Sequence, residues 1–159
     1  MISLVYVKTS YIDYLRTFES RVRFNKGQTR PYIGILFTVN GLKYYAPLSS
    51  PKPSHVKMKK NIDVIKIEGG KLGIINLNNM IPVRKNSIIK IDITKEKNPK
   101  YRMLLIQQAL FFNENEERII KRATTVYNSF IKGTLPKGVK ERCCNFTLLE
   151  EKSKLYIEK

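Results

Sequence analysis

The chain has 159 residues, enough for one domain with a buried core, and its hydrophobic content of 42% excludes a disordered protein. Its 30 Lys and Arg residues against 13 Asp and Glu residues give a formal net charge of +17, which predicts a polyanionic partner. No apolar run approaches the roughly 18 residues of a membrane-spanning helix, so we favour nucleic acid over a membrane surface as that partner.

The first thirty residues predict a strand, a short helix and a basic loop. Residues 3–7 form the apolar strand, and Thr9 or Ser10 can cap the helix that follows. That helix carries an apolar stripe made of Tyr11, Ile12, Tyr14, Leu15 and Phe18. The loop at residues 20–31 belongs to the most basic part of the chain, because residues 1–60 hold eleven Lys and Arg residues and only two acids.

A β-hairpin is predicted after this loop. Residues 32–39 and 42–48 flank Asn40-Gly41, the dipeptide that most strongly favours a two-residue hairpin turn. The second strand ends in Ser49-Ser50-Pro51-Lys52, which places two hydroxyls and an amine at the end of a rigid element. Binding and catalytic residues often lie on loops that a rigid scaffold positions, so this segment is a candidate functional site. The alternative is a simple turn, since Ser and Pro are common turn residues.

The middle of the chain predicts a Pro- and Lys-rich loop and three further strands. The loop covers residues 49–61, and the strands lie at residues 62–67, 72–77 and 88–93. Glu68-Gly69-Gly70-Lys71 is expected to form the turn between the first two of these strands. The asparagines that follow favour turn geometry, with contact to an RNA base edge as the alternative: Asn76, Asn78 and Asn79.

Three helices are predicted in the remainder. Asn98 caps the first, with Pro99 at its first position, and the helix runs to about Asn113. One face of it holds Tyr101, Leu104, Leu105, Gln108 and Phe112. Asn113 is expected to cap the second helix, which ends at Gly133. After a basic loop, the third helix is capped by Asn145 and covers residues 146–157.

Strands that come first and helices that come last predict an α+β fold. We expect a single domain over residues 1–159, built on a twisted antiparallel sheet or partly open barrel that the helices cover. Cys143 and Cys144 are adjacent, which argues against a disulfide between them, so we expect packing residues. Residues 1–7 lack the basic segment and the length of a signal peptide, and the chain is predicted to be reduced and cytoplasmic.

Four short segments, which together span nearly the whole chain, occur in an order that is typical of one protein family. They are residues 10–15 (Ser-Tyr-Ile-Asp-Tyr-Leu), residues 30–34 running into 45–52, residues 72–83, and residues 144–146 with 149–152. Tyr101-Arg102-Met103-Leu104 adds a weaker fifth. With this ordered set, the chain resembles the endoribonuclease toxins of type III toxin–antitoxin systems, the ToxN/CptN/AbiQ family.

The resemblance implies a fold like that of the Kid/MazF toxins, with a strongly twisted sheet and added helices. It also implies sequence-preferring, metal-independent cleavage of cellular or phage RNA, without a cofactor, that leaves a 2′,3′-cyclic phosphate. The expected partner is a short repeated antitoxin RNA folded as a pseudoknot, which inhibits the toxin in a closed RNA–protein assembly. The implied biological role is growth arrest and abortive infection against phage.

Carried over position by position, the resemblance implies a catalytic set. The family's active-site hydroxyl corresponds to Ser50, and its neighbour, often Thr in relatives, to Ser49. Lys52 and Arg30 match basic positions that suit stabilisation of a phosphorane charge, Arg30 with the option of bidentate contact. Tyr11 matches an N-terminal tyrosine that could hold a phosphate or stack on a base.

Further RNA contacts are expected from basic residues outside this set: Arg21, Arg23, Lys26, Lys57, Lys59 and Lys60. For Lys57, Lys59 and Lys60, the alternative to an RNA contact is a solvated loop. His55, the only histidine, lies three residues beyond Lys52 and could shuttle protons or contact RNA, although the resemblance does not point to it.

Two rival functions remain open from the sequence. Composition supports a non-catalytic RNA-binding protein equally well, and a Kid/MazF-like ribonuclease with a protein antitoxin is a third possibility. Tandem short repeats upstream of the reading frame would favour the toxin with an RNA antitoxin, whereas a small acidic protein encoded next door would favour the third reading.

Overall fold

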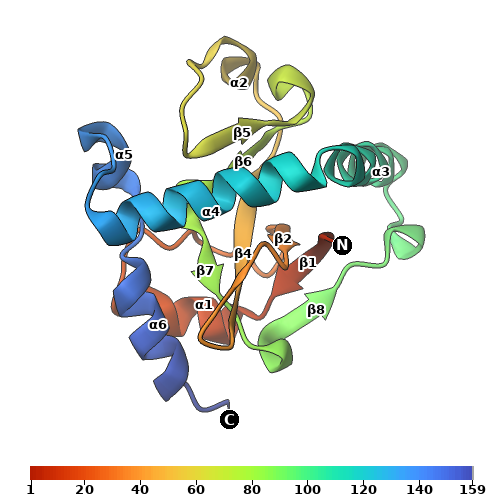
Figure 1. Cartoon of the computed structure of the whole chain (residues 1–159). Helices are drawn as coiled ribbons and strands as arrows, with labels where there is room; N and C mark the ends of the chain where they lie inside the picture. Colours follow the sequence, from red (N-terminus) through yellow and green to blue (C-terminus); the bar gives the residue numbers. More distant parts are fainter. Residues whose placement is uncertain (159) are drawn as a thin grey trace.

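An antiparallel sheet runs through the centre of the computed structural model, which describes residues 1–158 (Figure 1). Six strands follow one another in the order β5-β6-β4-β2-β1-β8, and two short strands, β3 and β7, also pair with β4. Their bounds are β1 (Ser3–Val7), β2 (Tyr32–Gly34), β3 (Thr38–Val39), β4 (Leu42–Ser49), β5 (Val64–Lys66), β6 (Ile74–Asn76), β7 (Ile81–Pro82) and β8 (Ile88–Lys90). Every pair is antiparallel, as predicted.

The predicted hairpin is confirmed, with one interruption. Asn40 and Gly41 both have positive φ, at 49° and 80°, as a two-residue hairpin turn requires. The first strand of the hairpin is split, however, into β2 and β3, which are separated by residues 35–37. Gly34, at the end of β2, lies directly against the Tyr45 ring, where a Cβ atom would clash. Residues 44–48 of β4 are buried, so this strand forms the middle of the core.

The strand predicted at residues 3–7 is confirmed with its bounds, and those predicted at 62–67, 72–77 and 88–93 are confirmed but shorter. Some further elements were not predicted. 3₁₀ turns take up the ends of the predicted strands, at Ile67–Gly70, Leu77–Asn79, Lys85–Ser87 and Ile93–Lys95. The two-residue strand β7 was not predicted. Within the predicted loop at 49–61, residues Pro53–Lys57 form the short helix α2, with Pro53 at its first position.

The remaining helices are α1 (Thr9–Arg16), α3 (Pro99–Glu114), α4 (Glu116–Lys132), α5 (Lys137–Arg142) and α6 (Phe146–Leu155). Asn98 and Asn145 cap α3 and α6 as predicted, each with its side chain accepting from a backbone N–H in the first turn. Asn115 rather than Asn113 precedes α4, and Lys8 rather than Thr9 or Ser10 precedes α1. The predicted basic loop after Gly133 contains α5.

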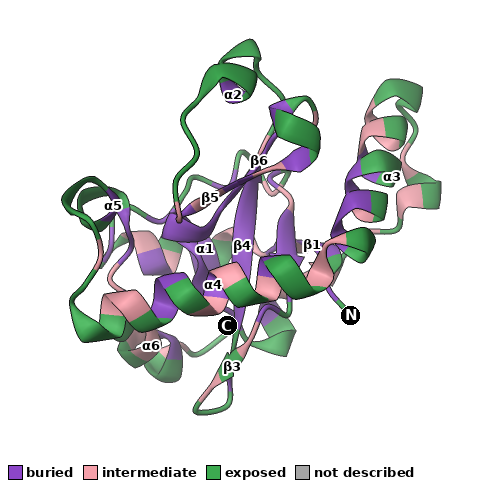
Figure 2. Cartoon of the chain, turned by 45° about the horizontal axis from the view of Figure 1, so that its top comes forward, coloured by how far each residue is buried: buried purple, intermediate pink, exposed green. Residues whose placement is uncertain are grey.

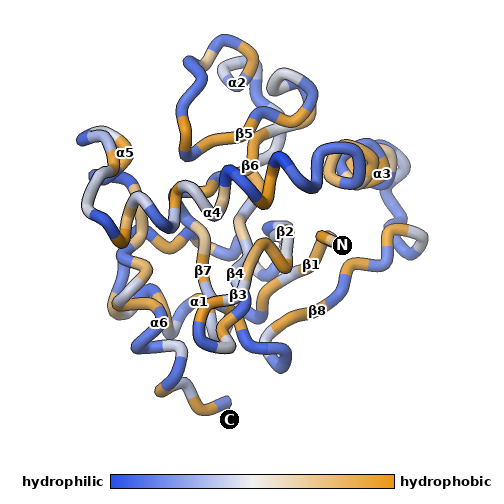
Figure 3. Tube along the Cα trace, viewed as in Figure 1, coloured by the Kyte–Doolittle hydropathy of each residue, from blue (hydrophilic) through white to orange (hydrophobic). Residues whose placement is uncertain are grey.

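The helices cover the sheet from more than one side. α4 crosses over the sheet, and α6 packs beside α1 and β7 (Figure 1). Hydrophobic and hydrophilic residues alternate along α4 (Figure 3), and its buried residues face the sheet (Figure 2). No helix within residues 1–158 is long and apolar enough to span a membrane. The likeness to Kid/MazF toxins stays a prediction.

A partly buried carboxylate joins three elements of the core. Glu150 on α6 accepts hydrogen bonds from the hydroxyls of Tyr44 on β4, at 2.5 Å, and Tyr127 on α4, at 2.7 Å. Phe146 packs edge-on against Tyr44 and tilted against Tyr127. The C-terminal helices are therefore fixed to the central strand by polar as well as apolar contacts.

The cap of α6 predicts a measurable contribution to stability. Asn145→Ala removes the side-chain oxygen that accepts from the Leu148 N–H at 3.1 Å, so we expect a loss of about 1 kcal/mol in the free energy of unfolding. Urea denaturation followed by circular dichroism measures it. Thr147→Ala, an exposed change in the same helix turn, is the control, and equal losses for the two variants would contradict the capping role.

Candidate functional site

A pocket of about 380 Å³ lies where strand β4 ends. Leu48 and Ser50 form one wall of this pocket. The basic loop 20–31 supplies a second wall, made of Lys26, Thr29, Arg30 and Pro31. The third wall comes from β1 and from the start of α3 with the residues before it: Tyr6, Glu96 and Tyr101. The structure thus brings Ser50, Arg30 and Lys26, all predicted from the sequence, to one cavity.

The two serines point to different neighbours. Ser50 is exposed and lines the pocket. The hydroxyl of Ser49 accepts a hydrogen bond from the buried amide of Asn76 on β6, at 2.8 Å. Gly73, with φ of +100°, lies against the carbonyl of Ser49, where a Cβ atom would clash. The contacts with Asn76 and Gly73 therefore fix Ser49 in place, and the fixed backbone of Ser49 positions Ser50 at the pocket.

Arg30 ties the basic loop to the end of β4. Its Nη1 donates to the carbonyl oxygen of Leu48 and its Nε to that of Phe24, both at 2.9 Å. The residue is only 8% exposed, and burial lowers the pKa of its guanidinium. Both acceptors are uncharged carbonyls, so the positive charge of Arg30 is held in place without being neutralised.

Other cations converge on the same place. The charge of Arg30, then burial, and then the charges of Lys52 and Arg23 lower the pKa of Lys26. Repulsion of this kind shows that the four cations share one region, because Coulomb interactions between exposed charges fade within about 10 Å at ordinary ionic strength. The resulting field attracts phosphate groups.

Lys52 precedes helix α2, and the buried side chain of His55 holds the backbone of Lys52 in place. The backbone N–H of Lys52 donates to Nδ1 of His55, at 3.3 Å. The side chain of Lys52 is exposed, whereas His55 is 6% exposed. Burial and then the charge of Lys52 lower the pKa of His55, which keeps its ring neutral at pH 7. In this structure His55 is thus a buried support for Lys52 rather than an RNA contact or a proton shuttle.

Tyr11 lies away from the pocket. The residue is fully buried, and its hydroxyl donates to the carbonyl oxygen of Pro82 at 2.5 Å and lies 2.9 Å from Oγ of Ser153. Burial raises the pKa of this hydroxyl. Its ring packs against Tyr14 and Tyr156, so no face remains for a phosphate or a base. The structure places Tyr11 in the core between α1 and α6, in contrast to the catalytic role expected from the sequence.

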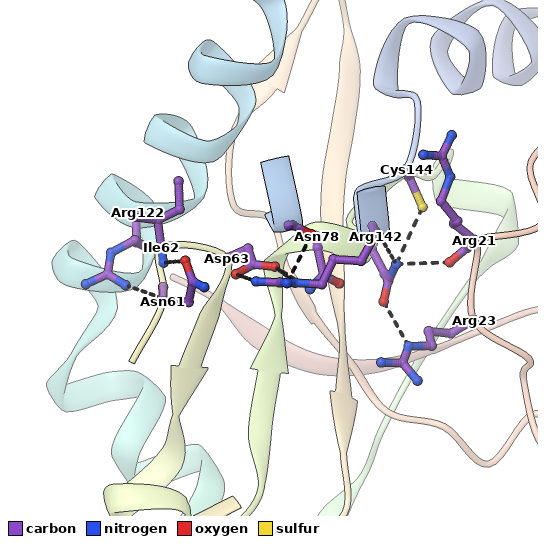
Figure 4. Close-up of polar contacts among 11 residues, drawn as sticks. Arg21, Arg23, Asn61, Ile62, Asp63, Asn78, Arg122, Arg142 and Cys144 are labelled. Atoms are coloured by element: carbon purple, nitrogen blue, oxygen red, sulfur yellow. Dashed lines mark hydrogen bonds and ion pairs between the residues drawn. The ribbon is translucent and has the colours of Figure 1, made fainter. Parts of the chain in front are cut away.

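Two of the predicted RNA-binding arginines have partners within the protein. Arg21 forms a two-pronged ion pair with Glu19, at 2.7 and 2.8 Å, and Glu19 also accepts from the backbone N–H of Asn145. Nε of Arg23 donates to Asn79 at 2.8 Å (Figure 4). Arg21 is therefore a link to the C-terminal helices in this structure, whereas Arg23 remains exposed and contributes to the field around Lys26.

The asparagines after β6 serve the fold. Asn78 donates to the buried carboxylate of Asp63 at 2.7 Å, and Asn79 donates to the carbonyl of Arg21 at 3.0 Å (Figure 4). Together with Asn76, they satisfy backbone and side-chain groups from distant segments, which agrees with the structural reading of these residues. Lys57, Lys59 and Lys60 are exposed and do not line the pocket. Their predicted RNA contacts stay a prediction.

Sequence reasoning missed four residues of the pocket that carry a hydroxyl or carboxyl group: Tyr6, Thr29, Glu96 and Tyr101. Burial, the neighbouring hydroxyl of Tyr6 and the charge of Glu96 raise the pKa of Tyr101. Tyr101 belongs to the fifth segment of the family resemblance, and that segment was the available signal. Tyr101 was expected instead on the apolar face of α3.

Several known proteins resemble this chain in sequence and in fold. Residues 3–154 match the model of the family described as toxin ToxN of the type III toxin–antitoxin system. The endoribonuclease ToxN of Bacillus thuringiensis subsp. kurstaki is 35% identical over 161 residues, which cover 96% of this chain and 83% of the relative.

Two solved structures share the fold over nearly their whole length. One, from work on selective toxin inhibition by a non-coding RNA pseudoknot in type III systems, is 34% identical, with a TM-score of 0.84 and 99% of each chain covered. The other is AbiQ, a lactococcal anti-phage endoribonuclease belonging to a type III toxin–antitoxin system. It is 28% identical, with a TM-score of 0.83 and 98% of each chain covered.

The lowered pKa of His55 predicts a pH-dependent stability. As pH falls through 6.5, the unfolded chain takes up a proton at His55 before the folded chain does, so the free energy of unfolding falls below this pH. His55→Asn keeps an acceptor for the Lys52 N–H but cannot titrate. Between pH 7 and pH 5, we expect wild type to lose more stability than His55→Asn in urea denaturation. Parallel curves for the two proteins would refute this assignment.

Proposed function

Because this chain belongs to the ToxN family of type III toxin–antitoxin toxins, we propose that it is an endoribonuclease toxin inhibited by a pseudoknot-forming antitoxin RNA. Its role would be defence against phage by arrest of the infected cell. The observation that carries the proposal is the pocket that joins Ser50 to the uncompensated cation Arg30. The substrate would be cellular or phage RNA.

The proposed chemistry is transesterification within the RNA. The substrate's 2′-oxygen attacks the adjacent phosphorus, the O2′–P bond forms and the P–O5′ bond breaks. The 2′-hydroxyl loses its proton and the departing 5′-oxygen gains one. The products are a 2′,3′-cyclic phosphate and a free 5′-hydroxyl. The protein must align the two oxygens and stabilise charge on the phosphorane, tasks that positioned donors and cations can perform without a metal.

Residues of the pocket, with Ser49 and Lys52 on either side of its Ser50, divide these tasks. Arg30, with a fixed position and full charge, and the exposed ammonium of Lys52 stabilise the non-bridging oxygens. Ser50 donates a hydrogen bond to the phosphate or orients the 2′-hydroxyl, and Ser49 supports it through Asn76. Tyr101 stays protonated because of its raised pKa, so we assign it as a hydroxyl donor on the opposite wall.

The antitoxin RNA would bind through the same excess of positive charge. The exposed lysines after α2, Lys57, Lys59 and Lys60, extend the basic region beyond the pocket. A repeated pseudoknot RNA that binds successive protein copies would produce a closed RNA–protein assembly.

Cleavage without a metal is the first test of this chemistry. Purified protein is expected to cut single-stranded RNA in excess EDTA, leaving 2′,3′-cyclic phosphate ends that are identified by end-mapping before and after phosphatase treatment. The reason is that Arg30, Lys26 and Lys52 already supply the positive charge. Loss of cleavage in EDTA, or products with 3′-hydroxyl ends, would rule out the proposed mechanism.

Ser50→Ala separates catalysis from RNA binding. Removing one positioned hydroxyl should lower the cleavage rate about 100-fold or more and abolish growth arrest, while antitoxin RNA affinity is retained. Ser54→Ala, an exposed serine four residues away, is the matched control and should remain fully toxic. A Ser50→Ala protein that still arrests growth would exclude Ser50 from the reaction.

A further inference from the structure

An exposed aromatic ring lies in the same basic loop as Arg30. Phe24 is 67% exposed. Its backbone is nevertheless firmly placed, because its carbonyl accepts from Nε of Arg30 at 2.9 Å. Asn25, the next residue, is buried and donates to the carbonyl of Val7 at 2.7 Å. The ring is therefore presented to solvent from a fixed backbone rather than from a loose loop.

One face of the Phe24 ring is covered by a cation. The guanidinium carbon of Arg16 lies 3.6 Å from the ring centroid. The Nη1 atom of Arg16 donates to the carbonyls of Ser20 and Val22, which locks the guanidinium in place. The stack of Arg16 and Phe24 leaves most of the ring surface open. It also places a positive charge directly behind the ring.

The backbone of Phe24 is connected to the pocket through a single side chain. Arg30 bonds the backbone carbonyl of Phe24 with one nitrogen and that of Leu48 with another, and Leu48 lines the pocket together with Ser50. A nucleic acid whose phosphate binds at Arg30 would have its neighbouring base within the region of the loop that carries Phe24. Single-stranded nucleic acids bind proteins through this combination of cations for phosphates and aromatic rings for bases.

We propose that Phe24, backed by Arg16, is a stacking site for an RNA base next to the phosphate held at Arg30 and Ser50. The inference rests on the proposed function for the position of that phosphate. Every base has a π-face, so the site accepts any base and serves to hold single-stranded RNA rather than to read its sequence.

The test uses a probe that the protein cannot cleave. A single-stranded 2′-O-methyl RNA with one 2-aminopurine lacks the 2′-hydroxyl nucleophile, and stacking of 2-aminopurine on an aromatic ring quenches its fluorescence. We expect wild-type protein to bind and quench the probe, and Phe24→Ala to bind about 10-fold more weakly with the quenching lost. Phe24→Tyr should behave as wild type, and Phe24→Leu, which keeps apolar bulk without a π-face, should behave as Phe24→Ala.

Phe18→Ala is the matched control. Phe18 is also exposed, at 43%, with Nζ of Lys152 lying 4.4 Å from its ring centroid, but it packs against Tyr14 beside α6 and lies outside the loop 20–31 that Arg30 joins to the pocket. Its loss should leave the affinity for the probe unchanged. Melting temperatures by circular dichroism show whether each variant is folded, and the comparison of Phe24→Tyr with Phe24→Leu decides the question even where the alanine variant is less stable.

The outcomes separate this inference from the proposed function. Unchanged affinity for Phe24→Ala, wild-type behaviour of Phe24→Leu, or no binding of the probe by wild type would overturn the stacking site. Cleavage of unmodified RNA by wild type together with any of these results leaves the proposed function intact. Quenching that depends on Phe24 in a protein that cuts no RNA would support the stacking site and refute the ribonuclease.

Discussion

The candidate site depends on the two hydrogen bonds that the Arg30 side chain makes to backbone carbonyls, those of Phe24 and Leu48. A buried guanidinium loses hydration, and only such hydrogen bonds or a carboxylate can offset that loss. Within residues 1–158 no carboxylate forms an ion pair with Arg30, so the carbonyls alone stabilise it inside the protein. The same bonds draw the loop 20–31 onto the end of β4. The wall of the pocket and its central charge are thus produced by one side chain.

The few acidic residues of this basic chain include several that serve the fold. Asp63 is fully buried and held by Arg142, through contacts of 2.5 and 2.9 Å, and by Asn78 (Figure 4). Burial opposes ionisation of Asp63, but the hydrogen bonds from Arg142 and Asn78 outweigh it and lower its pKa. Glu19 and Glu150 also accept hydrogen bonds within the fold, at the C-terminal helices. Carboxylates used inside the fold cannot neutralise surface lysines, so the net charge of +17 is carried largely on the outside, where a polyanion can reach it.

Local signals in the sequence were sufficient for the parts of the fold that depend on local chemistry. Asn40-Gly41 predicted its turn because both positions need positive φ, and Asn98 and Asn145 predicted helix starts because their side chains replace missing backbone acceptors. The split between β2 and β3 was not predicted, and the close approach of Gly34 to the Tyr45 ring on β4 is a contact between strands that no local pattern encodes. For the site, Ser50 and Arg30 were found through motifs. The burial of Tyr11 and the hydrogen bond between Glu19, the partner of Arg21, and the cap of α6 depend on contacts between segments more than a hundred residues apart.

The crowding of cations has a consequence for how an RNA antitoxin could act on this protein. The pKa of Lys26 is lowered chiefly by Arg30, and Lys52 and Arg23 add to this effect, so the cations in and around the pocket repel one another. A bound phosphate relieves that repulsion as well as making its own contacts, and this gain is available to any RNA backbone. Substrate and antitoxin would therefore be attracted by the same charges. Under the proposed function, inhibition requires only that a folded RNA occupy these cations in a geometry that keeps its 2′-oxygens out of line with the phosphate at Ser50, because electrostatic attraction alone does not produce cleavage.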